Sequence, residues 1–237
     1  MPFSNNKDEG FENKLAELIA EKLDAKLAYS WFTEATGYVP NTMGRDACDL
    51  VMGYAQGTGL IDDTNPYYYT SYVLLYRRDD ASLQGVDRLS DPRLKGKAIG
   101  YFARTPPASI LAMHGLVGAA KPFEVRDGNN SKVASAMIGD IASGELDAGV
   151  LWGPLGGYYA QRAAAPLELV PLVKETAGPP VIYGITMGVR PNEPEWKHKI
   201  NKVIAEKQSE IYLILEGYNV PVLDDQGNLI TAVAAER

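Results

Sequence analysis

The hydrophobic and polar positions of the chain alternate between the period of an amphipathic helix and the short apolar runs typical of strands. Helical spacing predicts helices over residues 12–23, 132–143 and 193–216. Strand-like runs predict strands over residues 25–31, 49–53, 71–77, 98–101, 148–152, 167–172 and 181–189. Because strands alternate with helices, we expect an α/β fold with mostly parallel sheets.

The order of these elements predicts two lobes. The chain builds one sheet up to about Arg77 and a second up to about Val173, and it then returns through Val181–Val189 to complete the first. Two crossings of this kind make a hinge beside a cleft. We therefore predict that residues 1–77 and 182–237 form lobe 1, and that residues 78–181 form lobe 2.

Turn residues locate the remaining segments. Gly, Pro and Asn predict a loop over residues 36–45 and turns over residues 56–66, and residues 83–94 predict a short helix and connector. Pro106 and Pro107 stand where a helix would begin, a position that tolerates proline. The opening segment, MPFSNNKDEGF, has the character of a loop that follows a strand, so we expect a first strand and a leader upstream of Met1.

The stretch Gly144–Ala160 predicts a helix end, a buried strand and a tight turn at Gly153-Pro154 into a second helix. Ligands usually meet an open α/β sheet at the ends of such strands. This stretch offers no reactive side chain there, since Trp152, Tyr158 and Tyr159 provide contact surface rather than chemistry.

The acidic composition of the chain argues against nucleic acids and anionic membranes as partners. The net charge is −7 and the sequence pI is about 5.0, whereas nucleic acids and anionic membranes require basic patches. No run of about 20 apolar residues is present, so we expect no membrane insertion. We expect a monomer with 14 tyrosines available for clefts and interfaces.

Residues suited to catalysis are few. His114 and His198 lie in helical patterns, Cys48 lies in a strand-like context, and no GxSxG or metal-binding motif occurs. The adjacent acids Asp62-Asp63 and Asp224-Asp225 lie among turn residues, where solvated side chains are the rule. We therefore expect no enzyme activity, no metal and no cofactor.

Ligand recognition has more candidates. Arg104 follows a predicted strand and precedes a helix start, which suits either a carboxylate-binding residue or an ordinary surface arginine. The tyrosines of 67–76 suit either the core or a cleft that stacks on a planar ligand. The cleft candidates are Tyr54, Gln56, Tyr68, Tyr101, Arg104, Thr105, Trp152, Tyr158 and Tyr183.

The chain resembles the type II periplasmic solute-binding proteins of ABC transporters, in which two α/β lobes close on a ligand. The similarity is carried by PYYYTSYVLLYRRDD, DPRLKGKAIGYF, SGELDAGVL, VIYGITMGVRPN and EIYLILEGYNVP, and it spans nearly the whole chain. The amino-acid-binding branch of that family holds its ligand with an arginine after the strand that resembles DLVMG and an aspartate after the strand that resembles LDAGVL. Residues 53–65 contain no arginine, and Trp152-Gly153-Pro154 stands in place of the aspartate.

A second set of segments is similar to the quinoprotein-dehydrogenase-associated branch of this family. The set comprises MPFSN, GFENKLAE, CDLVMG, PYYYTSYV, LWGPLGGYYA and ITMGVRP. The resemblance implies a periplasmic protein of methylotrophs that supports the maturation or activity of a PQQ-dependent methanol dehydrogenase. It also implies that Cys48 pairs with a cysteine upstream of Met1, because related members carry one in the preceding strand. This chain departs from the branch at TGYVPNTM and PYYYTSY, where relatives often carry arginine.

Two functions follow from the residues and the resemblance. In the first, the protein is a non-enzymatic accessory protein that contacts methanol dehydrogenase directly. In the second, it is a solute-binding protein for PQQ or another small planar carboxylate, with Arg104, the glycine-rich turns and the cleft aromatics as the binding groups. A cleft with convergent charged side chains favours the second function, and a plain or obstructed cleft favours the first.

Overall fold

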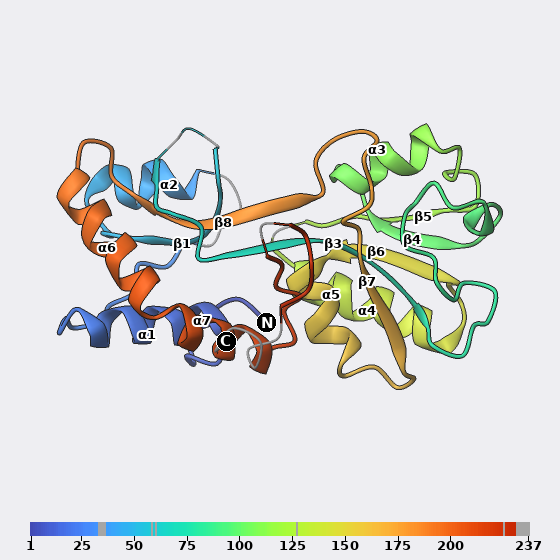
Figure 1. Ribbon diagram of the computed structural model, residues 1–237, viewed down its shortest axis with the longest axis horizontal. Coiled ribbons are helices and arrows are strands. Elements are labelled where there is room, and N and C mark those ends of the chain that lie inside the picture. Colours follow the sequence, from blue (N-terminus) through green and yellow to red (C-terminus); the bar gives the residue numbers. More distant parts are fainter. Residues whose placement is uncertain (33–36, 58, 60, 127, 225, 231–237) are drawn as a thin grey trace.

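One long strand, β3 (Tyr68–Arg77), runs through both halves of the molecule. In the computed structural model, which describes residues 1–32, 37–57, 59, 61–126, 128–224 and 226–230, Figure 1 shows two lobes side by side with β3 extending from one into the other. Tyr68–Ser71 pair with β8 (Ile182–Val189), while Tyr72–Arg77 pair with strands of the second lobe. The pairing of β3 therefore changes between Ser71 and Tyr72, and the division of the chain near residue 77 stays a prediction.

The sheet of the described residues has the order β1-β8-β3-β6-β4-β5, with β2 beside β8 and β7 beside β3. The remaining strands are β1 (Val51–Ala55), β2 (Asp62–Asp63), β4 (Ile99–Phe102), β5 (Lys121–Phe123), β6 (Ala148–Trp152) and β7 (Leu167–Pro171). Among the strand pairs of the described residues, only β4–β5 and β4–β6 are parallel. The expectation of mostly parallel sheets is therefore wrong, because β3 and β8 run antiparallel to each of their described neighbours.

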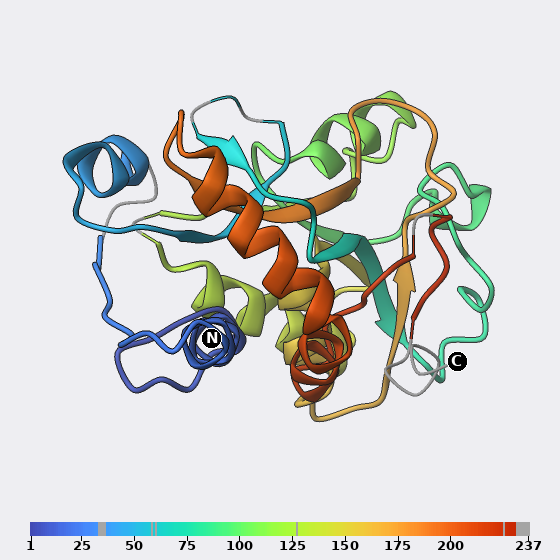
Figure 2. The same cartoon turned by 60° about the vertical axis from the view of Figure 1, so that its left-hand side comes forward.

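The first lobe is built on one face of β8 and the first half of β3. Helices α1 (Phe11–Lys22), α6 (Pro194–Glu206) and α7 (Gln208–Gly217) cover this face, as Figure 2 shows with α6 and α7 in front. Phe11, Leu15 and Ile19 recur at helical spacing and are buried with residues of α6, α7 and β8. A separate small cluster packs beneath α2 (Tyr38–Asn41) and the following 3₁₀ turn, Met43–Arg45.

The second lobe packs α3 (Pro106–Met113), α4 (Asn130–Ser143) and α5 (Gly153–Ala160) against β4 and β6. Gly100 and Gly149 face each other across β4 and β6, and Met137 and Ile141 of α4 pack over them. A Cβ on Gly149 would lie 2.7 Å from the Cδ1 atom of Ile141. The paired glycines therefore allow α4 to approach the sheet closely.

Three predictions of local structure are wrong. Residues 25–31 form no strand, because this segment pairs with no described strand. Tyr29 and Trp31 are 37% and 51% exposed and contact each other.

The helical pattern of 193–216 is divided between α6 and α7, since Lys207 leaves the helical backbone with ψ at 14°. Residues 37–45 contain short helical turns rather than a loop alone, and Thr36 lies outside the described residues. Residues 83–94 hold the expected short helix only as the 3₁₀ turn Pro92–Leu94.

Candidate functional site

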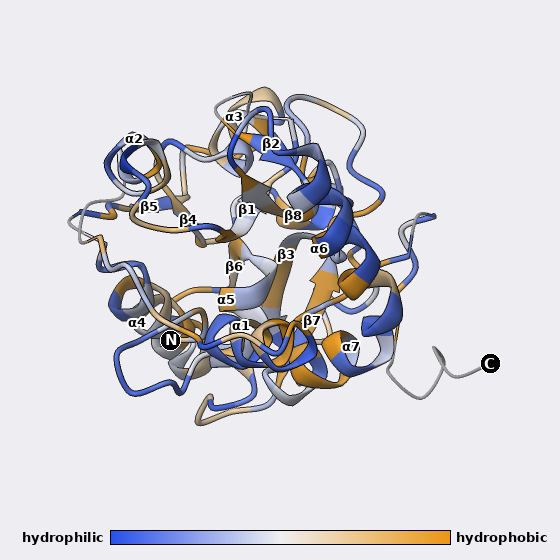
Figure 3. Cartoon of the chain, turned by 90° about the vertical axis from the view of Figure 1, so that its left-hand side faces the viewer, coloured by the Kyte–Doolittle hydropathy of each residue, from blue (hydrophilic) through white to orange (hydrophobic). Residues whose placement is uncertain are grey.

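A cavity of about 390 Å³ lies between the two lobes, where β3, β6 and β8 meet. Figure 3 shows β4, β5 and α4 on one side of β3 and α6 and α7 on the other side. The cavity lies on the side of β4 and α4, and residues from both lobes line it: Phe3, Ala55, Tyr72, Phe102, Ala103, Thr105, Val125, Asn130, Trp152, Leu155 and Tyr183. None of these described lining residues carries a formal charge.

Three aromatic rings of the cavity lining lie in contact with one another. The ring centroid of Trp152 lies 5.2 Å from that of Tyr72 and 5.6 Å from that of Tyr183, with interplanar angles of 64° and 74°. Trp152 ends β6, Tyr72 lies where β3 changes partners, and Tyr183 is near the start of β8. Burial raises the pKa of the Tyr72 phenol well above its ordinary value, so this hydroxyl is neutral and able to donate a hydrogen bond.

Two of the three hydroxyl groups in the described lining, those of Thr105 and Tyr183, already donate hydrogen bonds. The Thr105 hydroxyl donates to the carbonyl oxygen of Phe102 at 2.6 Å, and the Tyr183 hydroxyl donates to that of Pro180 at 2.9 Å. Helix α3 starts beside the cavity with Pro106 and Pro107, which have no N–H groups, and the N–H of Ala108 donates to the carbonyl oxygen of Thr105. The beginning of α3 therefore lacks the free N–H groups that bind anions at helix N-termini.

Of the nine cleft candidates, the structure brings Thr105, Trp152 and Tyr183 to the cavity. Tyr68 is buried in the core of the first lobe, and Tyr54 packs in the small cluster with Val39, Met43 and Ile61. The other four are not among the lining residues: Gln56 is exposed beside Gly184, Tyr101 packs against the core of the second lobe, Tyr158 stacks on Tyr218, and Arg104 lies on the surface.

The sequence prediction missed Phe3, Phe102 and Asn130, and it placed Tyr72 only in the general aromatic cluster. Phe102 ends β4 and Ala103 follows it, so the rule that ligands meet strand ends was sufficient to find them. Phe3 gave no such signal. It reaches the cavity because the opening segment packs against α1, where the ring centroids of Phe3 and Phe11 are 5.5 Å apart.

Arg104 does not face the cavity. Its side chain is 78% exposed, and its guanidinium pairs with the carboxylate of Glu124 at 3.1 Å. The backbone of Arg104 is left-handed, with φ at 62°, which helps turn the chain from β4 towards α3.

Replacement of Arg104 by glutamine should change the free energy of unfolding by less than about 1 kcal/mol, because exposed ion pairs contribute little. We also expect no effect on any ligand of the cavity, and both quantities can be measured by denaturant titration and calorimetry. A loss of ligand affinity would show that Arg104 swings into the cavity in the bound state.

Within the described part of the chain, no group of three or more His, Cys, Asp and Glu side chains lies together as metal ligands would. Cys48 is a half-buried free thiol beside the small cluster of the first lobe, and its backbone carbonyl accepts a hydrogen bond from Arg190. Its pairing with an upstream cysteine stays a prediction.

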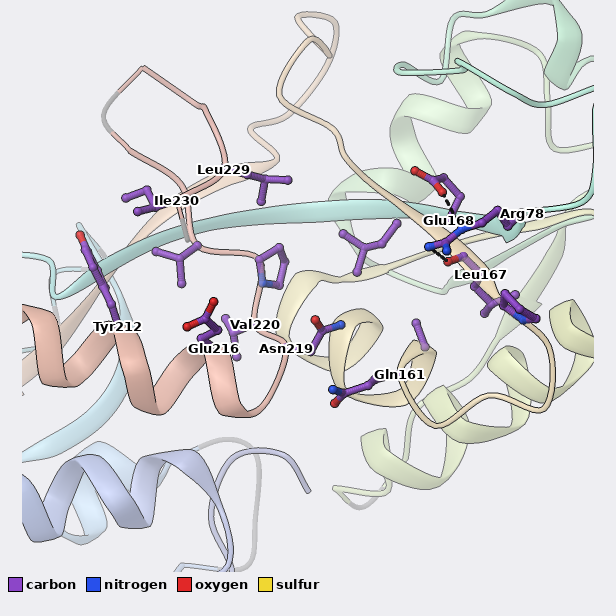
Figure 4. A pocket seen from close by; sticks show the side chains of 15 residues that line it. Arg78, Gln161, Leu167, Glu168, Tyr212, Glu216, Asn219, Val220, Leu229 and Ile230 are labelled. Carbon is purple, nitrogen blue, oxygen red and sulfur yellow. Dashed lines mark hydrogen bonds and ion pairs between the residues drawn. The ribbon is translucent and has the colours of Figure 1, made fainter. Parts of the chain in front are cut away.

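A second hollow, of about 460 Å³, is lined in part by the C-terminal segment that follows α7, at residues 219–222 and 229–230. Figure 4 shows Tyr212, Glu216 and Asn219 on one side and Leu167 and Arg78 on the other. Arg78 pairs here with Glu168 at 3.2 Å, and both side chains are largely exposed to solvent. The site is an open groove between α7 and β7, with one exposed ion pair that contributes little to stability.

Two α/β lobes, joined by crossing strands and with an open cavity between them, define the class of periplasmic binding proteins. The structure is similar to that of the periplasmic binding protein XoxJ from Methylobacterium extorquens AM1, with a TM-score of 0.79, 37% sequence identity and coverage of 95% of each chain. The chain belongs to the XoxJ and MoxJ/MxaJ family of periplasmic binding proteins. The resemblance noted in the sequence is thus confirmed.

Two further relatives agree with this assignment. Protein MoxJ from Paracoccus denitrificans is 27% identical over 94% of this chain and 85% of its own length. The structure of MxaJ from Methlophaga aminisulfidivorans MPT has a TM-score of 0.78, 23% identity and coverage of 94% of this chain and 96% of that chain, which shows the shared fold. No protein-family model matches the sequence. None of the helices described here is long and apolar enough to cross a membrane.

Proposed function

We propose that this protein is a non-enzymatic periplasmic accessory protein that supports the maturation or activity of a PQQ-dependent methanol dehydrogenase by direct contact. The observation that carries the proposal is membership of the XoxJ and MoxJ/MxaJ family along 95% of the chain. One relative, XoxJ, is named as a periplasmic binding protein, which supports a periplasmic location and a binding role for this chain.

The chemistry of the cavity supports an accessory role over amino-acid transport. An α-amino acid requires a cation for its carboxylate and an anion for its ammonium group, because a buried charge without a partner is costly. Neither kind of side chain lines the described cavity, and Trp152-Gly153-Pro154 stands at the strand end where the amino-acid-binding branch has its aspartate. The cavity is therefore unsuited to a zwitterion.

Direct contact with methanol dehydrogenase can be tested with the two purified proteins. We expect them to co-elute in size-exclusion chromatography, and we expect the accessory protein to raise the activity of dehydrogenase that has been reconstituted with PQQ. XoxJ, added in place of this protein, provides a matched control for the family. The absence of both a complex and any effect on activity would overturn the proposal.

A second function, solute binding, is favoured by the cavity itself, whose volume of about 390 Å³ lies within the range of ligand pockets. The version expected from the sequence, binding of PQQ or another planar carboxylate, depended on Arg104, which does not line the cavity. Calorimetric titration with PQQ tests this version directly. A measurable heat that is lost in the Arg104→Gln variant would support it, and a flat titration would remove PQQ from consideration.

A further inference from the structure

We propose that the aromatic cavity binds a small organic cation of the quaternary ammonium type. The structural basis is a group of five aromatic side chains in the described lining: Trp152, which contacts both Tyr72 and Tyr183, together with Phe3 and Phe102. The proposal stands on the geometry of the cavity and is independent of any contact with methanol dehydrogenase.

The angles between the rings favour a compact ligand over a flat one. A planar ligand stacks best between ring faces that are nearly parallel, whereas the neighbouring rings here meet at 64° and 74°. The three rings meet edge to face, so their planes point in different directions. A tetrahedral ammonium group can contact rings in several orientations at once, whereas a flat ring system cannot.

The electrostatics favour a cation. The face of an aromatic ring is electron-rich, and it attracts a desolvated cation within about 6 Å of its centroid. The cavity has no cationic side chain in its described lining, and the protein has a net charge of −7, which raises the local concentration of cations. The proline-capped start of α3 offers no free N–H groups to an anion.

A quaternary ammonium also matches the few polar groups available. It has no hydrogen to donate and no acceptor to satisfy, so it needs no matched hydrogen-bond partner inside an apolar cavity. The hydroxyls of Thr105 and Tyr183 already donate to backbone carbonyls. A carboxylate in the same place would lose its hydration without gaining a cationic partner.

Calorimetry on the unmodified protein tests the charge requirement. Tetramethylammonium chloride and choline chloride are the probes, and 3,3-dimethylbutanol is the uncharged analogue of choline with the same shape. We expect choline to bind at least about 10-fold more tightly than its neutral analogue, as cation–π attraction by two or more rings implies. Equal affinity for the two, or no heat with either cation, would overturn the proposal. Sodium chloride at equal concentration controls for ionic strength.

Substitutions then locate the site. Trp152→Leu should weaken tetramethylammonium binding at least about 10-fold, because it removes the ring that contacts both Tyr72 and Tyr183. Tyr158→Leu is the matched control, because Tyr158 already has a cation over its ring, Arg162 at 3.7 Å, but lies outside the cavity lining. Unchanged affinity in Trp152→Leu, or an equal loss in the control variant, would contradict the assignment. Failure of these tests leaves complex formation with methanol dehydrogenase unaffected, so the two proposals fail separately.

Discussion

The Gly157→Ala variant should lose about 2–3 kcal/mol of its free energy of unfolding, because a side chain here overpacks a closed contact. A Cβ atom on Gly157 would overlap the backbone oxygen of Asn219, and Pro221 also lies against this position. Asn219 holds the C-terminal segment to α5 by donating its side-chain amide hydrogen to the Gly157 carbonyl at 2.9 Å. The added methyl group cannot be accommodated without moving this segment away from the second lobe.

Denaturant unfolding measures this loss, and Gly139→Ala is the matched control. Gly139 lies in the middle of α4 and a Cβ atom there would meet no atom within 4 Å. Since alanine is a better helix former than glycine, the control variant should gain up to about 1 kcal/mol. If the two variants changed stability by similar amounts, close packing at Gly157 would not be the cause.

The second large effect is a loss of stability as the pH rises from 5 to 8, caused by Glu12. Burial raises the pKa of the Glu12 carboxyl from 4.5 to about 7. The folded state therefore binds a proton between these values that the unfolded state releases, and its stability falls as pH rises through this window. A pKa shift of this size corresponds to roughly 3 kcal/mol of the free energy of unfolding. Because Glu12 keeps some contact with solvent, we expect a loss of about 2 kcal/mol.

The surroundings of Glu12 explain the shift. Its carboxyl lies against Gly53 of β1, where burial disfavours the charged form. The negative charge of Glu12 in turn raises the pKa of the nearby phenols of Tyr38, Tyr67 and Tyr68. The Glu12→Gln variant removes the titrating group and nearly preserves its shape. Comparison of the two proteins at pH 5 and pH 8 isolates Glu12 from both histidines. A pH dependence that is equal in the two proteins would show that the carboxyl stays ionised throughout.

The second lobe was largely predictable from the sequence. The pattern of Val133, Met137, Ile138 and Ile141 predicted α4, and Gly153-Pro154 predicted the turn from β6 into α5, because local periodicity and turn residues determine these elements.

The predicted strand at 25–31 was wrong for a reason outside the segment itself. An alternating pattern produces a strand only where a neighbouring strand supplies hydrogen bonds, and no described strand does so here.

The site was predicted less well than the fold. Trp152 was found because it ends a buried strand, and strand ends determine where ligands meet an α/β sheet. Arg104 satisfied the same rule, yet its side chain extends to Glu124, a residue 20 positions away that the rule does not consider. The tyrosines of β3 show the same limit: alternation separates Tyr68 from Tyr69, but packing between the lobes decides that Tyr72 faces the cavity.

The continuity of β3 has a consequence for how the molecule unfolds. Because Tyr68–Ser71 pair in one lobe and Tyr72–Arg77 pair in the other, unfolding of either lobe would leave its half of β3 unpaired while the other half stayed in the sheet. Unpaired backbone groups at the end of a buried strand are costly. We therefore expect the two lobes to unfold together, so that amide hydrogens along the whole of β3 exchange together, at the rate of global unfolding.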